Sequence, residues 1–247
     1  MGERHFVMEE QGPVLVIRLA RPEKKNALSF ALMEDLTAAA RGLSGRTDLK
    51  AVVLAGSEGY FTAGMDLADP AGAGLAGASL SEKRAVLAIA PRLCQALEDI
   101  PQLTFAAIEG FCIGGGVSLV SALDFRIMAQ SSYIRAPEID WAMNMSWATL
   151  PRLLHLIGPA RTKELIVFGE AVKAQDAFSW GFAQRLCPDG SALSTALEMA
   201  RKAAQKPFGP ASMTKATVNA LATALDRLAS HMDADQFLLS VMERDKK

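Results

Sequence analysis

Three consecutive glycines, Gly114, Gly115 and Gly116, form the segment of this chain whose residue types most directly suggest chemistry. They lie between an apolar run at residues 103–108, which predicts a buried strand, and residues 117–123, which predict a helix. The backbone can approach a ligand closely there, and free N–H groups at a helix N-terminus favour negative charge. A phosphate loop is a weak alternative, because no Lys-Ser or Lys-Thr pair follows the glycines. The triplet therefore favours an anion or oxyanion site.

Two further segments have similar potential. Residues 60–67 follow a predicted strand, and Gly64 permits a tight turn that can direct the N–H of Met65 into a cleft. Taken alone, this segment favours a plain turn, because Ala-Gly pairs are common at strand ends. Glu138 follows Pro137 beyond the next strand and has apolar neighbours. A desolvated carboxylate has a raised pKa and can act as a base near neutral pH, although an exposed loop glutamate is the commoner case.

The elements that must position these residues alternate between strands and helices. Apolar runs predict strands at residues 14–19, 51–55, 103–108 and 125–129, and residues 6–9 are expected to pair with the first across a turn. Ser29 is expected to cap a helix carrying Leu32 and Leu36, and a long helix is expected over residues 81–99. This alternation predicts an α/β fold whose parallel strands are covered on both faces.

The chain is expected to divide into a core of residues 1–190 and a C-terminal helical region of residues 191–247. That region predicts helices at residues 193–204, 213–228 and 234–242, which could serve as an oligomer contact. Residues 69–79 are almost wholly Gly, Ala and Pro, so they are expected to form a mobile loop. This loop could be a lid beside the site or a plain connection.

Composition excludes several classes of protein. The 247 residues include 26 basic and 27 acidic side chains, for a net charge of −1, and no block of like charge suggests a nucleic-acid or membrane partner. Cys94, Cys112 and Cys187 are widely spaced, which indicates free thiols in a reducing compartment. Residues 1–11 contain no signal-peptide core. We therefore expect a cytoplasmic protein.

Other catalytic classes lack their motifs. The chain has no G-x-S-x-G elbow, and its histidines suggest no hydrolase triad; His155, in an apolar helical segment, is expected to be structural. No His, Cys or carboxylate cluster has metal-ligand spacing, and no dinucleotide fingerprint is present. We therefore expect no metal.

Taken together, the motifs resemble the enoyl-CoA hydratase/isomerase (crotonase) family. Residues 21–29, RPEKKNALS, resemble its N-terminal signature, and residues 61–67 and 113–116 resemble its two oxyanion loops. Ala136-Pro137-Glu138 resembles its catalytic loop, and residues 180–183 resemble a later stretch of the same fold. The resemblance covers about residues 6–190. It implies a spiral of strand–strand–helix units followed by C-terminal helices, and a homotrimer or a pair of trimers.

The resemblance also implies roles for individual residues. The N–H groups of Met65 and Gly115 would form an oxyanion hole for the thioester oxygen of an acyl-CoA, with Glu138 as acid/base. The CoA and acyl path would be lined by Ala27, Ala63, Gly64, Asp66, Leu67, Gly114 and Trp141. Lys24 or Lys25 could meet a CoA phosphate. No separate cofactor is implied, because coenzyme A is part of the substrate.

One position departs from the hydratases of this family, which carry a second glutamate where this chain has Ser118. Hydration needs one group to activate water and another to deliver a proton, whereas moving a double bond needs a single carboxylate. We therefore expect an isomerase, with hydratase or a non-catalytic acyl-CoA-binding protein as alternatives. Trp141, Met143, Met145 and Trp147 could shape an acyl pocket or pack in the core.

Overall fold

The computed structural model describes residues 5–57, 59–74 and 77–244 and is built around a six-stranded sheet. Its strands lie in the order β1 (Phe6–Gln11), β2 (Val14–Leu19), β3 (Ala51–Ala55), β4 (Leu103–Ile108), β6 (Phe125–Ala129) and β9 (Arg185–Cys187). β1 is antiparallel to β2, and every later pair of neighbours is parallel. The predicted parallel α/β core is therefore confirmed, with four of its strands at the predicted residues.

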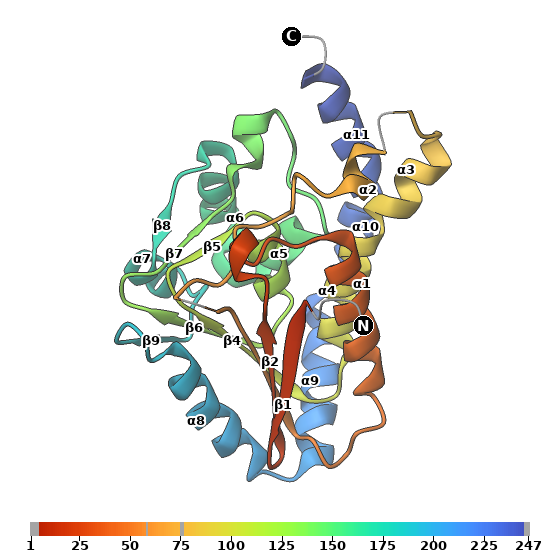
Figure 1. Cartoon of the computed structure of the whole chain (residues 1–247). Helices are drawn as coiled ribbons and strands as arrows, with labels where there is room; N and C mark the ends of the chain where they lie inside the picture. The colour runs from red at the N-terminus through yellow and green to blue at the C-terminus, as the bar shows by residue number, and fades with distance from the viewer. Residues whose placement is uncertain (1–4, 58, 75–76, 245–247) are drawn as a thin grey trace.

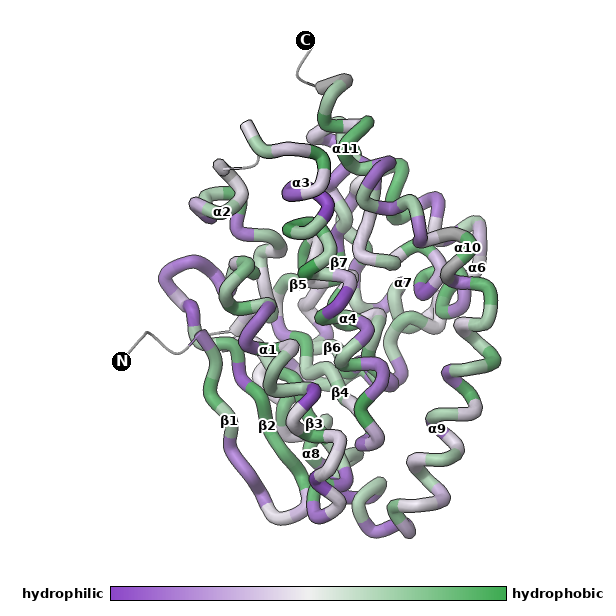
Figure 2. The backbone as a smooth tube through the Cα atoms, turned by 90° about the vertical axis from the view of Figure 1, so that its right-hand side faces the viewer, coloured by the Kyte–Doolittle hydropathy of each residue, from purple (hydrophilic) through white to green (hydrophobic). Residues whose placement is uncertain are grey.

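Helices cover both faces of this sheet (Figure 1). α8 (Ala192–Ala204) packs on the face where Val16, Val53 and Phe105 stand beside one another on neighbouring strands. α1 (Phe30–Gly42), α4 (Ile89–Asp99) and α5 (Gly115–Ser121) pack on the other face. Strands buried on both faces must be apolar throughout. In Figure 2 the tube is accordingly hydrophobic along β2, whereas the edge strand β1 carries exposed charged residues.

Two predicted segments differ from the observed ones between α1 and β4. The long helix expected over residues 81–99 is two helices, α3 (Leu80–Leu87) and α4, which meet at Ala88. Pro91 accounts for the break, because it has no N–H to donate to the carbonyl of Leu87. The loop expected at residues 69–79 contains a short helix, α2 (Pro70–Ala73), capped by the Asp69 carboxylate. Residues 75 and 76 of this segment lie outside the described residues.

A second sheet, which the sequence does not predict, has three very short strands. β5 (Phe111–Ile113) is parallel to β7 (Tyr133–Arg135), and β7 is antiparallel to β8 (Val172–Lys173). Two isolated bridges extend the ladder, one between Thr62 and Cys112 and one between Leu28 and Met65. Segments from five parts of the sequence thus lie side by side. Gly114 follows β5 and Glu138 follows β7. Because these strands are parallel, both residues lie at the same end of the sheet, where the strands finish.

The other described helices are η1 (Pro22–Lys24), η2 (Pro137–Trp141), α6 (Thr149–Phe168), α7 (Ala174–Ser179), α9 (Phe208–Ala222), α10 (Asp226–Ser230) and α11 (Asp233–Arg244). The single helix predicted over residues 213–228 is therefore wrong, because α9 ends before α10 begins. The hydroxyl of Thr223 donates to the carbonyl of Asn219 at this break, which offers the backbone an alternative to the helix. The predicted boundary at residue 190 stays a prediction, although α8 just beyond it packs on the sheet.

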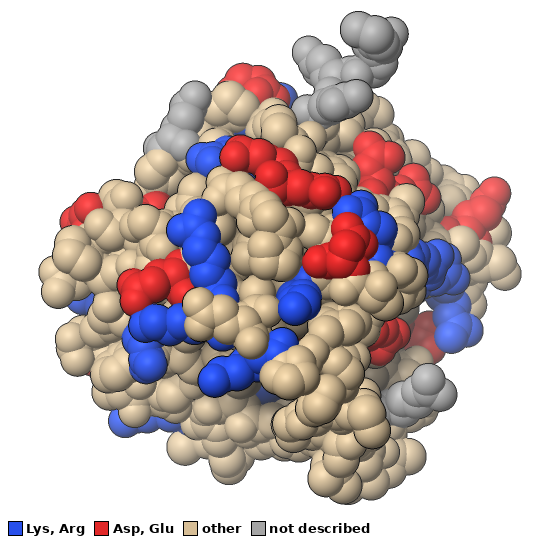
Figure 3. All heavy atoms as spheres, turned by 90° about the horizontal axis from the view of Figure 1, so that it is seen from below, with Lys and Arg blue, Asp and Glu red and all other residues tan. Residues whose placement is uncertain are grey.

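The C-terminal helix packs against a helix from the first half of the sequence. α11 lies beside α3, where Arg84 and Asp235 form an ion pair of 3.3 Å (Figures 1 and 2). None of the helices in the described ranges is long and apolar enough to cross a bilayer. On the face shown in Figure 3, basic and acidic side chains are interspersed. All three cysteines are free and buried, as predicted.

Candidate active site

Glu138 is partly buried at the start of η2, shortly after β7. One oxygen of its carboxyl group, Oε1, lies only 2.8 Å from the position that a Cβ atom on Gly114 would occupy. The other oxygen, Oε2, is buried and has no hydrogen-bond partner among the described residues. Burial, which disfavours the charged form, raises the pKa of Glu138 to about 7. This carboxyl group can therefore exchange a proton at neutral pH.

The glycine triplet is shaped by close neighbours at each position. Gly114 has a φ of +52°, and a side chain there would meet the Glu138 carboxyl group. A Cβ atom on Gly115 would lie 2.5 Å from a ring carbon of Trp147. Both contacts are possible only because the residues are glycines. The triplet begins α5, so its first N–H groups have no acceptor within the helix.

The segment containing Met65 runs beside the triplet. A Cβ atom on Gly64, whose φ is +90°, would lie 2.7 Å from the carbonyl oxygen of Ile113 and 3.5 Å from the amide nitrogen of Gly115. On its other side the segment bonds Leu28, which donates to the Gly64 carbonyl and accepts from the N–H of Asp66. Because backbone groups alternate along an extended segment, the N–H of Met65 points away from Leu28.

The N–H groups of Met65 and Gly115 are free to bind a ligand. Within the described part of the chain, neither donates a hydrogen bond to the protein. Free backbone donors in a glycine-lined site, close to a carboxyl group that titrates near neutral pH, suit a carbonyl compound that gains negative charge while losing a proton. No group of His, Cys or carboxylate side chains in the described ranges could hold a metal ion.

The other predicted site residues are placed less centrally. Ala27 and Asp66 are buried, and the Asp66 carboxylate forms an ion pair of 2.9 Å with Arg21 that ties two loops together. Ala63 is partly buried and donates its N–H to the carbonyl of Lys25. Leu67 and Trp141 are exposed to 72 % and 54 %, so both side chains face solvent. Their assignment to the CoA and acyl path stays a prediction.

Comparison with known proteins identifies this architecture. A family model described as enoyl-CoA hydratase/isomerase matches residues 9–247. The chain belongs to the enoyl-CoA hydratase/isomerase family. It is 32 % identical over 224 residues to the human mitochondrial Delta(3,5)-Delta(2,4)-dienoyl-CoA isomerase, covering 87 % of this chain and 67 % of that protein. For the mouse isomerase the identity is 33 %, and the match covers 60 % of that protein. This chain is 31 % identical to a probable enoyl-CoA hydratase of Rhizobium meliloti, and the match covers 89 % of this chain and 82 % of that protein.

Solved structures agree with the predicted crotonase fold. An enoyl-CoA hydratase/isomerase from Xanthobacter autotrophicus has a TM-score of 0.88 at 26 % identity, covering 97 % of this chain and 88 % of that one. An enoyl-CoA hydratase from Bacillus anthracis has a TM-score of 0.81 at 28 % identity, and the match covers 98 % of this chain and 90 % of that one. The fold class and the family inferred from the motifs are therefore confirmed, and the chain is an enzyme of this family. Relatives of both names occur, so the comparisons leave open isomerase or hydratase.

Ser118, at the position where the resemblance implies a second glutamate in hydratases, is hydrogen-bonded in the protein interior. It is almost fully buried, and its hydroxyl shares a hydrogen bond of 2.6 Å with the hydroxyl of Thr149. A short neutral hydroxyl pair of this kind supplies no carboxylate for activating water. Glu138 is thus the carboxyl group that the described structure places against the glycine triplet in this family member.

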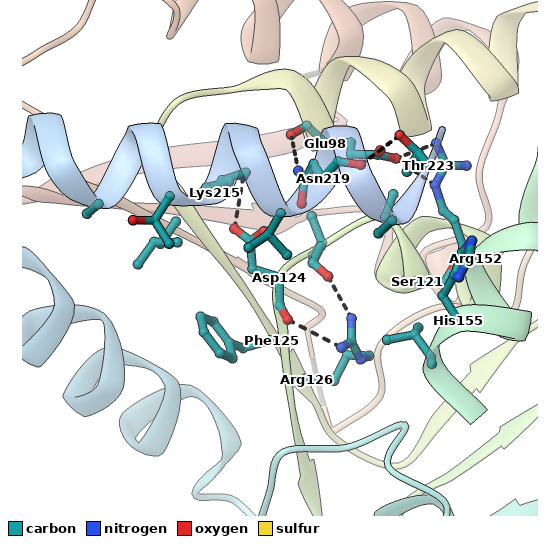
Figure 4. Close-up of a pocket in the computed structure, with 18 of the residues that line it drawn as sticks. Glu98, Ser121, Asp124, Phe125, Arg126, Arg152, His155, Lys215, Asn219 and Thr223 are labelled. Carbon is teal, nitrogen blue, oxygen red and sulfur yellow. Dashed lines mark hydrogen bonds and ion pairs between the residues drawn. The ribbon is translucent and has the colours of Figure 1, made fainter. Parts of the chain in front are cut away.

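A cavity of about 680 Å³ lies elsewhere in this crotonase fold, between α9 and the C-terminal end of α5 (Figure 4). Three of the basic groups that line it already have partners. The Arg126 guanidinium donates to five protein oxygen acceptors, Lys215 pairs with Asp124 at 2.9 Å, and Arg152 pairs with Glu98 at 2.6 Å. This cavity is not the candidate active site, because its lining includes neither Glu138 nor the glycine triplet.

Sequence reasoning identified Trp147 only as one of several pocket residues, and it missed Arg152 and Asp233. Trp147 lies against Gly115, and the two charged residues hold the backbone next to it. Asp233 is 85 residues from its partner, the N–H of Ala148, so no local pattern could have revealed the contact. An aspartate at the start of a helix reads as a favourable first-turn charge and nothing more.

Proposed function

We propose that this enzyme stabilises a thioester enolate between the N–H groups of Met65 and Gly115 and moves the double bond of an enoyl-CoA. The observation that carries the proposal is the Glu138 carboxyl group, which is buried against Gly114 and has a pKa of about 7. It is the acid/base suited to act beside a carbonyl carbon held at these amides. The named activities of the human isomerase and its mammalian counterparts support the same reaction class.

The reaction needs one carboxylate and no water. The Glu138 carboxylate removes a proton from the α-carbon of a 3-enoyl-CoA, and the electron pair of that C–H bond moves into a dienolate whose oxygen accepts hydrogen bonds from both amides. The carboxylic acid then returns the proton to the γ-carbon, which leaves the double bond between the α- and β-carbons. With its pKa of about 7, Glu138 is suited both to take and to return the proton.

Hydration of 2-enoyl-CoA is the second candidate, favoured by the relatives named as hydratases. Ser118 and Thr149 argue against it, because their paired hydroxyls stand where the second carboxylate is expected. We also propose that the protein is a homotrimer or a pair of trimers, because α9 and the following segments expose large apolar side chains. These are Met213, Val218, Leu221, Leu225, Leu228, Leu239 and Met242. A cytoplasmic location stays a prediction.

The test is a panel of 2-enoyl-, 3-enoyl- and 3-hydroxyacyl-CoA esters followed by NMR in deuterated water. We expect conversion of 3-enoyl to 2-enoyl esters, with rates that rise with pH up to about 7 as Glu138 ionises. Glu138→Gln should lower kcat by roughly 10²–10⁴. The matched control is Glu170→Gln, at an exposed glutamate outside the site. Hydration of 2-enoyl esters much faster than migration of the 3-enoyl bond would contradict the isomerase assignment.

A further inference from the structure

Two consecutive residues beside the site have a backbone conformation that L-amino acids rarely adopt. Trp147 has a φ of +63° and Ala148 a φ of +53°, in the left-handed region. Neither is a glycine, asparagine or aspartate, the residue types that tolerate this region best. Such a conformation persists only where surrounding contacts hold it.

Two buried charged groups hold this backbone, one from the following turn of α6 and one from the C-terminal helix α11. The Arg152 guanidinium donates to the carbonyls of Trp147 and Ala148 at 3.2 and 3.1 Å, and its ion pair with Glu98 fixes it. The Asp233 carboxylate, at the first residue of α11, accepts the N–H of Ala148 at 2.7 Å. Both Arg152 and Asp233 are buried.

α11 also reaches the preceding part of the same loop. The N–H of Asn144 donates to the hydroxyl of Ser240, and the Asn144 side chain contacts Gln236. Asp235, two residues after Asp233, turns instead to Arg84 on α3. The C-terminal helix is thus bonded both to the loop of residues 144–148 and to α3, and Figure 1 shows it near the top of the molecule, beside α3.

These hydrogen bonds fix the position of the Trp147 indole ring. The ring edge of Trp147 stands so close to Gly115 that a methyl group on that residue would lie 2.5 Å from Cη2, 2.7 Å from Cζ3 and 3.2 Å from Cζ2. The ring therefore forms a wall next to one of the two free amides. Because the backbone of Trp147 is held in a strained conformation, its ring can take only a few positions. Such a fixed ring suits a residue that discriminates between ligands.

We propose that Trp147 determines which acyl groups the site accepts, and that Asp233 is the positioning residue that holds its ring in place. The inference rests on the proposed function, because it takes the Gly115 amide as a donor to the thioester oxygen. The ring edge fills the space beside this amide, so the site favours a flat acyl chain without a branch at the α-carbon. A methyl branch there would meet the ring.

The first test measures the ring position without any turnover. The three tryptophans are Trp141, Trp147 and Trp180, so Trp141→Phe/Trp180→Phe leaves Trp147 as the fluorescent reporter. Asp233→Ala in this background should raise the acrylamide quenching constant about twofold or more, while Asp233→Asn, which keeps an oxygen acceptor, should restore it. Asp235→Ala removes the same charge from the same helical turn without touching Ala148, so it should leave quenching unchanged. Equal quenching in the Asp233→Ala and Asp235→Ala proteins would overturn the positioning role.

The second test measures selectivity as the ratio of kcat/KM for a 2-methyl-3-enoyl-CoA to that for the linear ester, both of which carry an α-proton. Trp147→Ala should raise this ratio about tenfold or more, since one methyl group in a pocket changes kcat/KM by roughly 10–200-fold. Asp233→Ala should shift it in the same direction, and Asp235→Ala should not. An unchanged ratio in Trp147→Ala would overturn the specificity role even if Asp233→Ala fails to fold. If wild-type protein converts neither ester, the proposed function fails, and the quenching experiment still decides whether Asp233 positions the ring.

Discussion

Replacing Glu138 by glutamine should make the protein more stable at alkaline pH, although the same change removes the proposed acid/base. The wild-type carboxyl group lies against Gly114, and its buried Oε2 has no hydrogen-bond partner in the described part of the chain. Its ionised form is therefore worse solvated in the folded protein than in the unfolded chain. Glutamine has nearly the same shape and never ionises, so it removes this pH-dependent penalty.

The size of the effect follows from the pKa. Folding raises the pKa of Glu138 from 4.5 to about 7, and one pKa unit corresponds to about 1.4 kcal/mol, so the full effect is about 3 kcal/mol. Between pH 4.5 and 7 the folded state retains a proton that the unfolded state has lost, so the free energy of unfolding falls as pH rises. The loss is complete above pH 7, and below 4.5 both states are protonated.

Chemical denaturation at pH 5 and pH 8 measures this difference directly. Protein concentration must be held fixed, since an oligomer's stability depends on it. The fall in unfolding free energy from pH 5 to pH 8 should be smaller in Glu138→Gln than in wild type by roughly 2–3 kcal/mol. Glu170→Gln, at an exposed position, should follow wild type. If Glu138→Gln and wild type lose the same stability over this range, the carboxyl group is not desolvated and the reasoning is wrong.

Two further predictions concern packing and assembly. Gly115→Ala should force the Trp147 ring or the amide to move, because the new methyl group would lie 2.5 Å from the ring, and it should cost about 1–3 kcal/mol in denaturation and roughly 10²–10³ in kcat. Gly45→Ala, where no atom lies within 4 Å of the new methyl group, should change neither quantity. Leu221→Lys, at a side chain 76 % exposed on α9, should dissociate the oligomer in sedimentation velocity, and a wild-type protein that sediments as a monomer would contradict the trimer proposal.

The main sheet could be predicted because its strands carry their own signal. Each of β2, β3, β4 and β6 is covered on both faces, so almost every residue must be apolar and the run is visible in the sequence. The cap at Ser29 is equally local, since its hydroxyl accepts the N–H of Leu32 three residues later. The break at Ala88 was also readable in principle, because Pro91 cannot complete a helix through that point.

The second sheet could not be predicted, because β5 and β7 have three residues each and β8 has two. Strands this short show neither alternation nor an apolar run. Their pairing nevertheless decides the site, since the ladder through Thr62, Cys112 and Ile134 sets Gly64, Gly114 and Glu138 next to one another. The motifs identified these residues by resemblance, whereas their adjacency is a property of contacts distant in sequence.

The environment of Glu138 could not be predicted from the sequence either. The site combines main-chain groups, which a family pattern can locate, with side-chain contacts, which it cannot. Both proposed donors belong to the main chain, so residue 65 can change its side chain without losing its N–H, and the second donor requires only that position 115 stay small. The choice of reaction and substrate then falls to side chains whose partners lie far away in sequence, such as Ser118 with Thr149 and Trp147 with Gly115. A family pattern can therefore point to the residues of a candidate site in a chain about 30 % identical to its relatives, while the chemistry proposed there depends on contacts that only the folded structure reveals.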